Sequence, residues 1–346
     1  MSMKQGFASL AGTGSIGLLE ERITQHVGAA FAVALCNGTA ALHAALIACD
    51  VGPGDQVVVP SYTWGGTIAA LLQVGALPVF ADINENLTLD PADVAAKITA
   101  RTKAVIAVHL LGYPAECETL GRICSMANVA LIEDCAQAYG ARIGGRSVGS
   151  FGIGCFSFGA GKLISAGDGG VLTTNDREQY EKVLFRTQHP LRQLRDIRNG
   201  SAVNQFALNY RMSERTSRSI LSGIDDTRTK VESRGRQYGR LIEHIRRGRL
   251  QGVFAEHPGA GVSPSWHHFS PRIDEEAFRS ESMGIKKFVE AEGFRIERGY
   301  VPVPLHLDPV LKKLVPERYR ELISKAILPA TEAAVRTRIG IALKKD

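Results

Sequence analysis

One lysine in this sequence stands in a setting that suits covalent chemistry. Lys162 lies within the small-residue stretch Gly159-Ala-Gly-Lys-Leu-Ile-Ser-Ala-Gly-Asp-Gly-Gly170, directly after an apolar run. Residues 153–158 and 170–174 both predict short buried strands, which places the lysine on the connection between them. The glycines around it allow a ligand or another piece of backbone to come close. Lys162 is therefore the first candidate for a reactive amine.

The same stretch does not fit the phosphate-binding loop of nucleotide hydrolases. That loop reads G-x-x-x-x-G-K-[ST], but Phe156 occupies the position of its first glycine and Leu163 that of its hydroxyl residue. A lysine in a glycine-rich loop is more often solvated than catalytic. The remainder of the chain must therefore supply the partners of a reaction.

Buried strands and amphipathic helices alternate through the first half of the chain. Apolar runs predict strands over residues 31–35, 56–59, 76–80, 104–108 and 129–132, and helical periodicity predicts helices over 15–27, 40–48, 91–98 and 118–127, with one more ending at 72. Ser15 and Asp90 are expected to cap two of these helices. Such alternation predicts the α/β fold class, with a mainly parallel sheet covered by helices on both faces.

Polar residues follow several of these predicted strands, at the edge of the sheet where ligands of α/β proteins gather. They are Thr39, Trp64, His109, Asp134, Gln137 and Ser157. The turn Cys36-Asn-Gly-Thr39 also precedes a helix, whose first amides would form an anion cradle. Trp64 could stack on a ligand or belong to the core.

A carboxylate, a phosphate cradle, an aromatic ring and a lysine from separate strand ends match the needs of pyridoxal 5′-phosphate. The aldehyde of this cofactor reacts with a lysine amine, and a carboxylate facing its pyridine nitrogen keeps that nitrogen protonated. Lys162 and Asp134 fit these two roles.

At these residues the sequence strongly resembles the DegT/StrS group of sugar aminotransferases, which are aspartate-aminotransferase-like enzymes of fold type I. The resemblance is continuous from about residue 14 to residue 213 and patchy beyond. The motifs that carry it are Cys36-Asn-Gly-Thr-Ala-Ala-Leu42, Gly52-Pro-Gly-Asp-Gln-Val57, Pro60-Ser-Tyr-Thr-Trp64, Val108-His109, Ile132-Glu-Asp-Cys-Ala-Gln137, Phe156-Ser157-Phe with Lys162, Gly167-Asp-Gly-Gly170 and Asn209-Tyr-Arg-Met-Ser213.

This resemblance implies a role for each matching residue. Lys162 would bind the cofactor covalently and act as general base, Asp134 would face the pyridine nitrogen, and Gln137 would contact the phenolic oxygen. The remaining cofactor contacts would come from Gly38, Thr39 and Ser157 at the phosphate, Trp64 on the ring, and Asn209 at the phosphate of the neighbouring subunit. A homodimer with shared active sites is therefore implied. Some members carry histidine in place of the lysine and are dehydratases, so Lys162 favours transamination.

Three departures from the family pattern fall where substrate would be touched. The chain has Asp168 in place of a glutamate, Gly159-Ala160 in place of His-Pro, and Tyr300-Val-Pro-Val-Pro-Leu-His306 in place of His-Tyr-Pro-x-Pro-Leu-His. Tyr300, His306 and the strand-end residue His109 are accordingly the candidates for substrate contact.

The resemblance implies transfer of an amino group from L-glutamate or L-glutamine to a keto-sugar or keto-cyclitol, in amino-sugar or antibiotic biosynthesis. A lyase or dehydratase of the same fold is the alternative, because the lysine loop is similar to that of aminohydroxybenzoate synthases. A non-enzymatic binding protein is disfavoured by the presence of both Lys162 and Asp134.

Charge is unevenly distributed along the 346 residues, whose formal net charge is +6. Residues 182–249 hold 16 Lys and Arg against 6 Asp and Glu, a local excess of +10. The segment predicts a long Arg-rich helix over Thr229–Arg249, and Arg186, Arg192, Arg195 and Arg198 lie where a loop could fold over the mouth of a site. An anionic, nucleotide-linked acceptor is therefore expected, whereas no module for nucleic-acid binding accompanies the charge.

Composition predicts an ordinary globular protein with two domains, a large cofactor-binding domain over 1–230 and a smaller α+β domain over 231–346. In the latter, short strands are expected over Ser265–Ile273, a helix over Glu275–Glu290 and a strand over Phe294–Glu297. The absence of a signal peptide or a long apolar stretch predicts a cytoplasmic protein that does not contact membranes. Six cysteines without C-x-x-C spacing predict neither a metal site nor disulfides.

Overall fold

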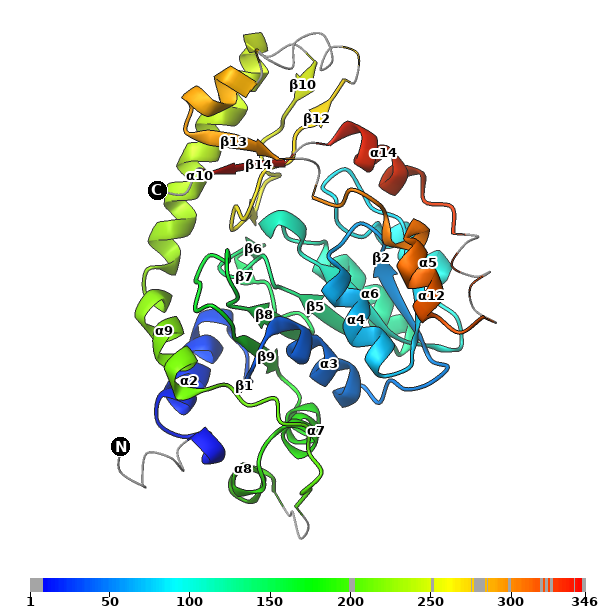
Figure 1. Cartoon of the computed structure of the whole chain (residues 1–346), viewed down its shortest axis with the longest axis vertical. Coiled ribbons are helices and arrows are strands. Elements are labelled where there is room, and N and C mark those ends of the chain that lie inside the picture. Colours follow the sequence, from blue (N-terminus) through cyan, green and yellow to red (C-terminus); the bar gives the residue numbers. More distant parts are fainter. Residues whose placement is uncertain are drawn as a thin grey trace.

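A seven-stranded sheet forms the centre of the molecule (Figure 1). The computed structural model describes residues 9–198, 203–249, 252–274, 276, 284, 286–297, 300–317, 320, 323, 326–338 and 340–343. In spatial order the strands are β1 (Phe31–Leu35), β9 (Gly170–Thr174), β8 (Ile153–Ser157), β5 (Ala130–Asp134), β4 (Thr102–Val108), β2 (Gln56–Pro60) and β3 (Leu77–Ala81).

All neighbouring strands of this sheet are parallel except where β9 takes part. β9 pairs antiparallel with both β1 and β8, whereas β8, β5, β4, β2 and β3 run the same way. The mainly parallel α/β sheet is thus confirmed. The carboxyl ends of β1, β4, β5 and β8 consequently meet at one edge.

Helices cover both faces of the sheet, and the alternation of side chains in β1 shows how. Val33 and Leu35 point into a core shared with one set of helices, and Ala32 and Ala34 into a core shared with another. The first set is α3 (Gly38–Ala48), α4 (Gly65–Gln73) and α7 (Arg177–Thr187), and the opposite face carries α2 (Ser15–Val27), α9 (Glu214–Ile224), α5 (Pro91–Lys97) and α6 (Cys117–Ala127).

Of the two expected helix caps, one is confirmed and one is wrong. Asp90 caps α5, because its side chain accepts from the amide of Ala92 and Pro91 begins the helix. The residue before α2 is Gly14, with no side-chain cap. Ser15 is already helical, and its Oγ lies 2.8 Å from Oγ of Ser217 on α9.

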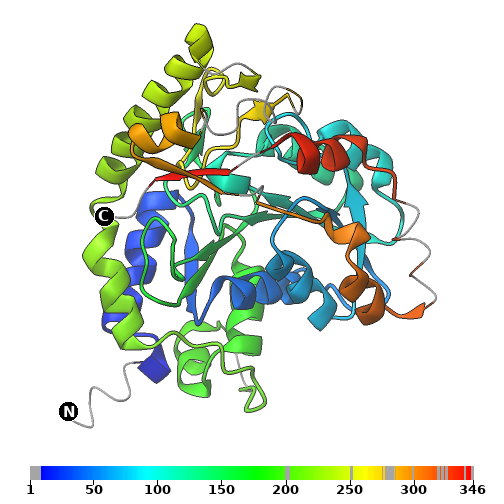
Figure 2. The same ribbon diagram turned by 45° about the horizontal axis from the view of Figure 1, so that its top comes forward.

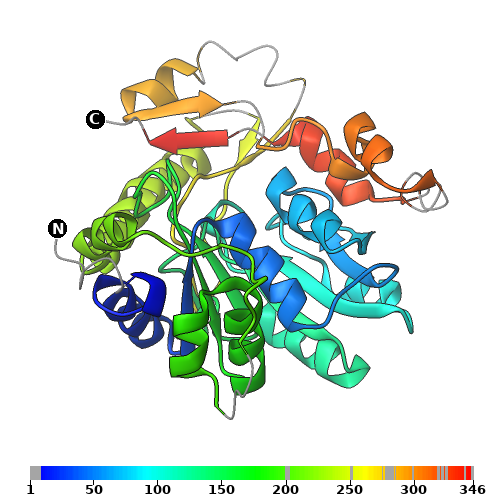
Figure 3. The same ribbon diagram turned by 60° about the horizontal axis from the view of Figure 1, so that its bottom comes forward.

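The C-terminal third is built around the helix α10 (Thr227–His244), which is followed by a wider helical turn, η2 (Ile245–Arg249). Gly248 adopts φ 72° in this turn, so the helix predicted over Thr229–Arg249 ends early. Small sheets lie beside α10: β10 (Val253–Phe254) with β12 (Arg272–Ile273), and β13 (Phe294–Glu297) with β14 (Gly340–Leu343). Figures 2 and 3 show β13 and β14 together on one side of the large sheet.

The strand at Phe294–Glu297 is confirmed, but most of the segment Ser265–Ile273, where short strands were expected, does not form a strand. Only its last two residues form β12. The preceding residues instead hydrogen-bond to a short turn, η1 (Leu110–Gly112), through the amides of Ser265 and His267. Pro264 and Pro271 border this segment and offer no amide for a ladder. The helix predicted over Glu275–Glu290 falls mostly outside the described residues.

The last described segment packs on the large sheet as well as on the small ones. Leu311 in α12 (Pro309–Leu314) and Ala334 in α14 (Pro329–Thr337) belong to the same buried cluster as α3 and α4. The division of the chain into two domains at residue 230 stays a prediction. The segment that contains α12 and α14 contacts both of the predicted domains.

A buried ion pair fixes α8 (Pro190–Asp196) to the rest of the fold. Arg192 is 0% exposed, and its Nη2 lies 2.8 Å from Oε2 of Glu20 on α2. The other carboxylate oxygen of Glu20 accepts from the amide of Ala34 in β1. Burial raises the pKa of Glu20, and the charge of Arg192 opposes that rise. The pair therefore ties two helices and an edge strand together.

We predict that Arg192→Met lowers the free energy of unfolding by about 3–5 kcal/mol, because it leaves the Glu20 carboxylate buried without a counter-charge. Urea denaturation measures the change. Arg195→Met on the same helix is the control; its side chain is 40% exposed, and its loss should cost less than about 1 kcal/mol. Equal losses in the two variants would contradict the role of the buried pair.

Candidate active site

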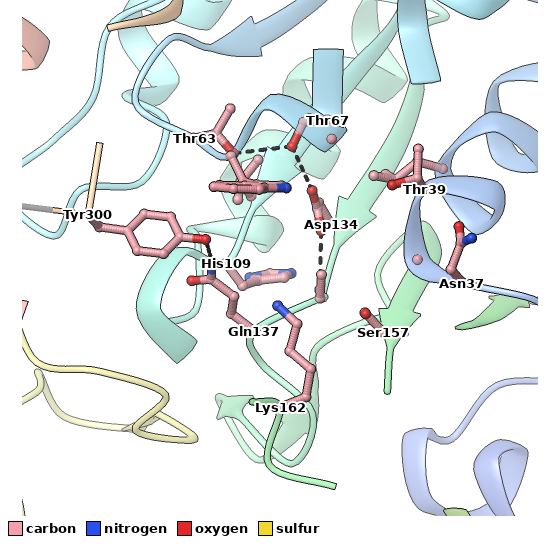
Figure 4. Close-up of a pocket in the computed structure, with 16 residues that line it drawn as sticks. Asn37, Thr39, Thr63, Thr67, His109, Asp134, Gln137, Ser157, Lys162 and Tyr300 are labelled. Carbon is pink, nitrogen blue, oxygen red and sulfur yellow. Dashed lines mark hydrogen bonds between the residues drawn. The ribbon is translucent and has the colours of Figure 1, made fainter. Parts of the chain in front are cut away.

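A pocket of about 170 Å³ lies at the edge where the carboxyl ends of the parallel strands meet (Figure 4). It is bordered by the beginnings of α3 and α4 and by the connection between β8 and β9. Lys162 is the only lysine or arginine among its lining residues, which are Asn37, Gly38, Thr39, Leu42, Thr63, Trp64, Gly66, Thr67, Val108, His109, Asp134, Ala136, Gln137, Ser157, Lys162 and Tyr300.

One end of the pocket can hold an anion. Asn37 caps α3 by accepting from the amide of Ala40, so the helix begins with the amides of Gly38 and Thr39 at the pocket. A Cβ on Gly38 would lie 2.8 Å from Cβ of Ser157, which explains why only glycine fits there. Helix N-termini attract phosphate through their free amides and their dipole. The predicted cradle residues are thus brought together.

Asp134, the last residue of β5, supplies a buried carboxylate in the middle of the pocket. Thr67 Oγ1 donates to its Oδ2 at 2.8 Å, and the amide of Ala136 donates to its Oδ1 at 3.1 Å. Burial raises the pKa of Asp134, while these hydrogen bonds and the charge of Lys162 oppose the rise. A cationic ring nitrogen beside it would restore the balance lost through burial.

Lys162 enters the pocket from the connection between β8 and β9, with its amine near Asp134 (Figure 4). Its backbone is held by a hydrogen bond from its amide to the carbonyl of Gly159. Its Nζ has no hydrogen-bond partner among the described residues. Burial lowers the pKa of Lys162, although the charge of Asp134 opposes this. A lowered pKa increases the share of neutral, nucleophilic amine at neutral pH.

Gln137 and Tyr300 close the side of the pocket opposite the anion cradle. The Gln137 amide group donates to the Tyr300 hydroxyl, and Gln137 Oε1 accepts from the amide of Leu111 at 2.6 Å. Burial and the charge of Asp134 raise the pKa of Tyr300 to about 12, so its hydroxyl stays protonated at neutral pH. Both side chains can therefore offer hydrogen bonds to a ligand oxygen.

Trp64 stands at the open part of the pocket and is 68% exposed. It precedes α4, and its indole lies 3.1 Å from the place where a Cβ of Gly66 would be. A core position, the other interpretation of this residue, is therefore wrong.

His109 lines the pocket but is 0% exposed, and its nitrogens are engaged elsewhere. Nε2 lies 3.1 Å from Glu133 Oε2, and Nδ1 accepts from the amide of Ala115. A substrate hydrogen bond to His109, as the sequence suggested, would require breaking one of these contacts. The ring instead forms part of the pocket wall.

His109 also lies within 4.8 Å of Glu133 and Cys135, a group whose atoms could in principle hold a metal ion. Glu133, however, already accepts from the amides of Gly149, Phe151 and Gly152 as well as from His109. These four donors use the acceptor sites of the carboxylate. The group therefore stabilises the turn before β8.

Two predicted site residues lie away from the pocket. His306 is 0% exposed and contacts Oγ of Ser61 at 2.7 Å through Nδ1, so it supports the wall and does not line the pocket. Asn209 is exposed, and its Oδ1 accepts from Nε of Arg211.

Within one subunit, the arginines expected over the mouth of the site do not lie at the pocket. Arg192 is buried against Glu20, and Arg195 pairs with Asp196. Helices α7 and α8, which hold three of the four, lie at the end of the molecule opposite β10 and β12 (Figure 1). The local charge excess therefore does not place arginine in the pocket.

Sequence reasoning missed Thr67 and Asn37. Thr67 holds Asp134, and Asn37 caps the helix of the anion cradle. Asn37 lies in a motif that was recognised and Thr67 follows another by three residues; a small polar residue at the start of a helix after a strand was the available signal.

The pocket fits pyridoxal phosphate on its own geometry. The tight approach of Gly38 to Ser157 opens a cradle for the phosphate, Asp134 offers a carboxylate for the ring nitrogen, and the Lys162 amine is unpartnered among the described residues. This combination is the one that the cofactor requires.

No helix of the described residues is long and apolar enough to span a membrane.

Comparison with known proteins agrees with this chemistry. Over 293 residues the chain is 36% identical to UDP-N-acetyl-3-dehydro-alpha-D-glucosamine 3-aminotransferase of Acidithiobacillus ferrooxidans, covering 83% of this chain and 74% of that protein. Over 318 residues it is 32% identical to a Micromonospora echinospora protein named for L-glutamine:3-amino-2,3-dideoxy-scyllo-inosose aminotransferase activity, covering 88% and 74%.

Structural comparison leads to the same group. The crystal structure of 3-amino-5-hydroxybenzoic acid synthase superposes with a TM-score of 0.78 at 29% identity, covering 96% of this chain and 85% of that chain. The model of the DegT/DnrJ/EryC1/StrS aminotransferase family matches residues 3–337. The chain therefore belongs to this family of fold type I enzymes and is a pyridoxal phosphate-dependent aminotransferase.

Proposed function

We propose that the enzyme transfers an amino group from L-glutamate or L-glutamine to a keto-sugar, nucleotide-linked in the first instance, or to a keto-cyclitol. The observation that carries the proposal is the Lys162 amine, unpartnered among the described residues, beside the buried carboxylate of Asp134. The two named relatives act, by their names, on a UDP-linked keto-sugar and on an inosose. Amino-sugar or antibiotic biosynthesis in the cytoplasm would be the setting.

Pyridoxal phosphate, when bound, supplies an electron sink that makes the α-hydrogen of the amino donor acidic. The amides at the start of α3 and Ser157 would hold its phosphate, and Trp64 would cover its ring. Asp134 would keep a proton on the ring nitrogen. Lys162 Nζ would take the proton from the α-carbon of the donor and return a proton to the carbon of the acceptor, a task suited by its lowered pKa.

Asn209 supports a homodimer with shared active sites. It is exposed and lies away from the pocket of its own subunit, on the segment that also presents Phe206, which is 96% exposed. A large exposed aromatic ring beside a polar residue is typical of an interface. Each Asn209 would then complete the phosphate site of the other subunit.

A lyase or dehydratase activity is the second candidate. The similarity to 3-amino-5-hydroxybenzoic acid synthase favours it, together with the loop Gly161-Lys-Leu-Ile-Ser-Ala-Gly167. Dependence on an amino donor separates the two activities, because a dehydratase consumes none.

We predict that Lys162→Ala abolishes borohydride-dependent attachment of the cofactor and lowers transamination by at least about 100-fold, the range for loss of a general acid–base group. Mass spectrometry of the peptide containing residue 162 measures the attachment. Lys103→Ala, which removes an exposed lysine, serves as the control. A Lys162→Ala protein that is still covalently labelled would refute the assignment.

Mixing Asn209→Ala with Lys162→Ala subunits should restore part of the activity, because each mixed dimer keeps one site with both residues intact. Subunit exchange is verified first with differently tagged proteins. The matched control mixes Asp134→Ala with Lys162→Ala; both residues lie in the same pocket, so neither site is intact. No gain in the first mixture, despite exchange, would exclude a shared site.

A panel of acceptors tests the substrate class. With a UDP-linked 3-keto-sugar, the KM of the acceptor should rise clearly between about 0.01 and 0.15 M salt, where the screening length falls from roughly 30 to 8 Å. With an inosose the KM should not respond to salt. Efficient turnover of the inosose alone, without activity on any nucleotide sugar, would replace the nucleotide-linked acceptor by a cyclitol.

A further inference from the structure

A second cavity, of about 260 Å³, lies beside the lysine pocket and is larger than it. Four segments of the chain meet there: the loop after β3, the turn η1, residues 254–272 around β10 and β12, and the end of α14. Its volume is close to the lower end of the roughly 300–1,000 Å³ of small-molecule sites. The size suits a group no larger than a mononucleotide.

Flat rings make up much of its wall. Tyr113, Phe254, Trp266, His268 and Phe269 all line the cavity. Trp266 is held rigidly, because its indole stacks on Tyr238 with the ring centroids 5.4 Å apart. A wall of this kind binds the faces of planar, aromatic groups.

Trp266 also occupies a strained backbone conformation, with φ 57°. Hydrogen bonds on both sides hold the strain: the amide of Ser265 donates to Gly112, and that of His267 donates to Leu111. Such outliers are costly in free energy and cluster at ligand sites. The fold thus maintains the position of the indole at a cost in stability.

Two arginines add positive charge to this aromatic wall. Arg338 donates to the carbonyls of Ser270 and Glu85, and the guanidinium of Arg272 lies 4.6 Å from the ring centroid of Phe254. Neither arginine forms an ion pair with a carboxylate among the described residues. Burial lowers the pKa of Arg338, and the nearby charge of Arg272 adds to the effect, whereas Tyr62 and Glu85 oppose it. A bound anion would relieve this repulsion.

Two carboxylates at the cavity do not meet this demand. Glu85 and Glu256 both line it but are exposed to solvent, and neither lies within ion-pair distance of the two arginines. Solvent screens exposed carboxylates strongly. The arginines therefore remain available to an anionic ligand.

The cavity shares its wall with the lysine pocket. Leu111 lines the second cavity, and its amide donates to Gln137, which lines the first. His268 lines the second cavity, and its ring stands edge-on to that of Tyr300 at 6.4 Å between centroids. Gln137 and Tyr300 are themselves hydrogen-bonded. A ligand in the second cavity would therefore contact Leu111 and His268, which in turn contact Gln137 and Tyr300.

We propose that the second cavity binds a nucleotide, with the base between the aromatic side chains and the phosphates at Arg272 and Arg338. Arginine pairs with two phosphate oxygens at once and stacks on flat rings, which suits both parts of such a ligand. The nucleotide is either the activating group of the acceptor or a separate ligand that acts through the shared wall. The first assignment rests on the proposed function; the binding site itself does not.

Tryptophan fluorescence tests the site. The chain has two tryptophans, so in a Trp64→Phe background the signal reports Trp266 alone. Titration with UDP and GDP should change this signal, whereas uridine and inorganic phosphate should bind more weakly. Arg272→Gln should raise the Kd at least about tenfold, the effect of losing hydrogen bonds to a charged group. Arg336→Gln removes an exposed arginine of α14 outside the cavity and should leave the Kd unchanged.

Inhibition of the wild-type enzyme separates the two sources of the nucleotide. Competition with a nucleotide-sugar acceptor, together with a higher acceptor KM in Arg272→Gln and an unchanged donor KM, identifies the activating group of the acceptor. A change in kcat that saturating acceptor does not reverse identifies a separate ligand. Nucleotide binding without any transaminase turnover would remove the proposed function and keep the site. Absence of binding at millimolar concentration, or equal Kd values in the two arginine variants, overturns the site.

Discussion

A carboxylate buried at the end of β5 is the constraint around which this enzyme is arranged. Glu133 and Asp134 are consecutive, and side chains of a strand alternate between its two faces. Glu133 accepts three backbone amides of the turn before β8, whereas Asp134 faces the pocket and is held by Thr67. One carboxylate therefore fixes the strand that leads to the lysine, and its neighbour provides the charge that the lysine and the cofactor require. A shift of β5 by one residue would exchange these two roles.

The pocket combines groups that would be unfavourable singly. Burial raises the pKa of Asp134 and lowers that of Lys162, so it disfavours the charged form of each residue, whereas the charge of each favours the charged form of the other. The amides at the start of α3 add a site for negative charge without using an arginine or lysine. Before the cofactor binds, the pocket is therefore a set of incompletely matched charges, and a zwitterionic ligand completes it.

Local patterns in the sequence were enough to predict most of the sheet and to place the strand-end residues near Lys162. The reason is that apolar residues recur with a clear period in the strands and in the helices. They could not predict contacts between distant parts of the chain. Arg192 was expected at the site, but Glu20, which is 172 residues away in sequence, holds it in the interior. His306 meets Ser61 across 245 residues, and the second cavity joins four separate segments. Such partners are set by the fold as a whole.

The antiparallel direction of β9 determines how the chain can place Lys162 at the edge of the sheet. A parallel successor to β8 would need a crossover, usually a helix on one face of the sheet. Because β9 is antiparallel to β8, the chain returns directly through residues 158–169, and both ends of this return are anchored in adjacent strands. The lysine segment is thus a short return at the rim of the sheet, anchored in the core by Phe158 and Ile164. Evolution or an engineer could exchange the part of this return that carries the lysine, and so change the reaction while the sheet and the start of α3 are inherited intact.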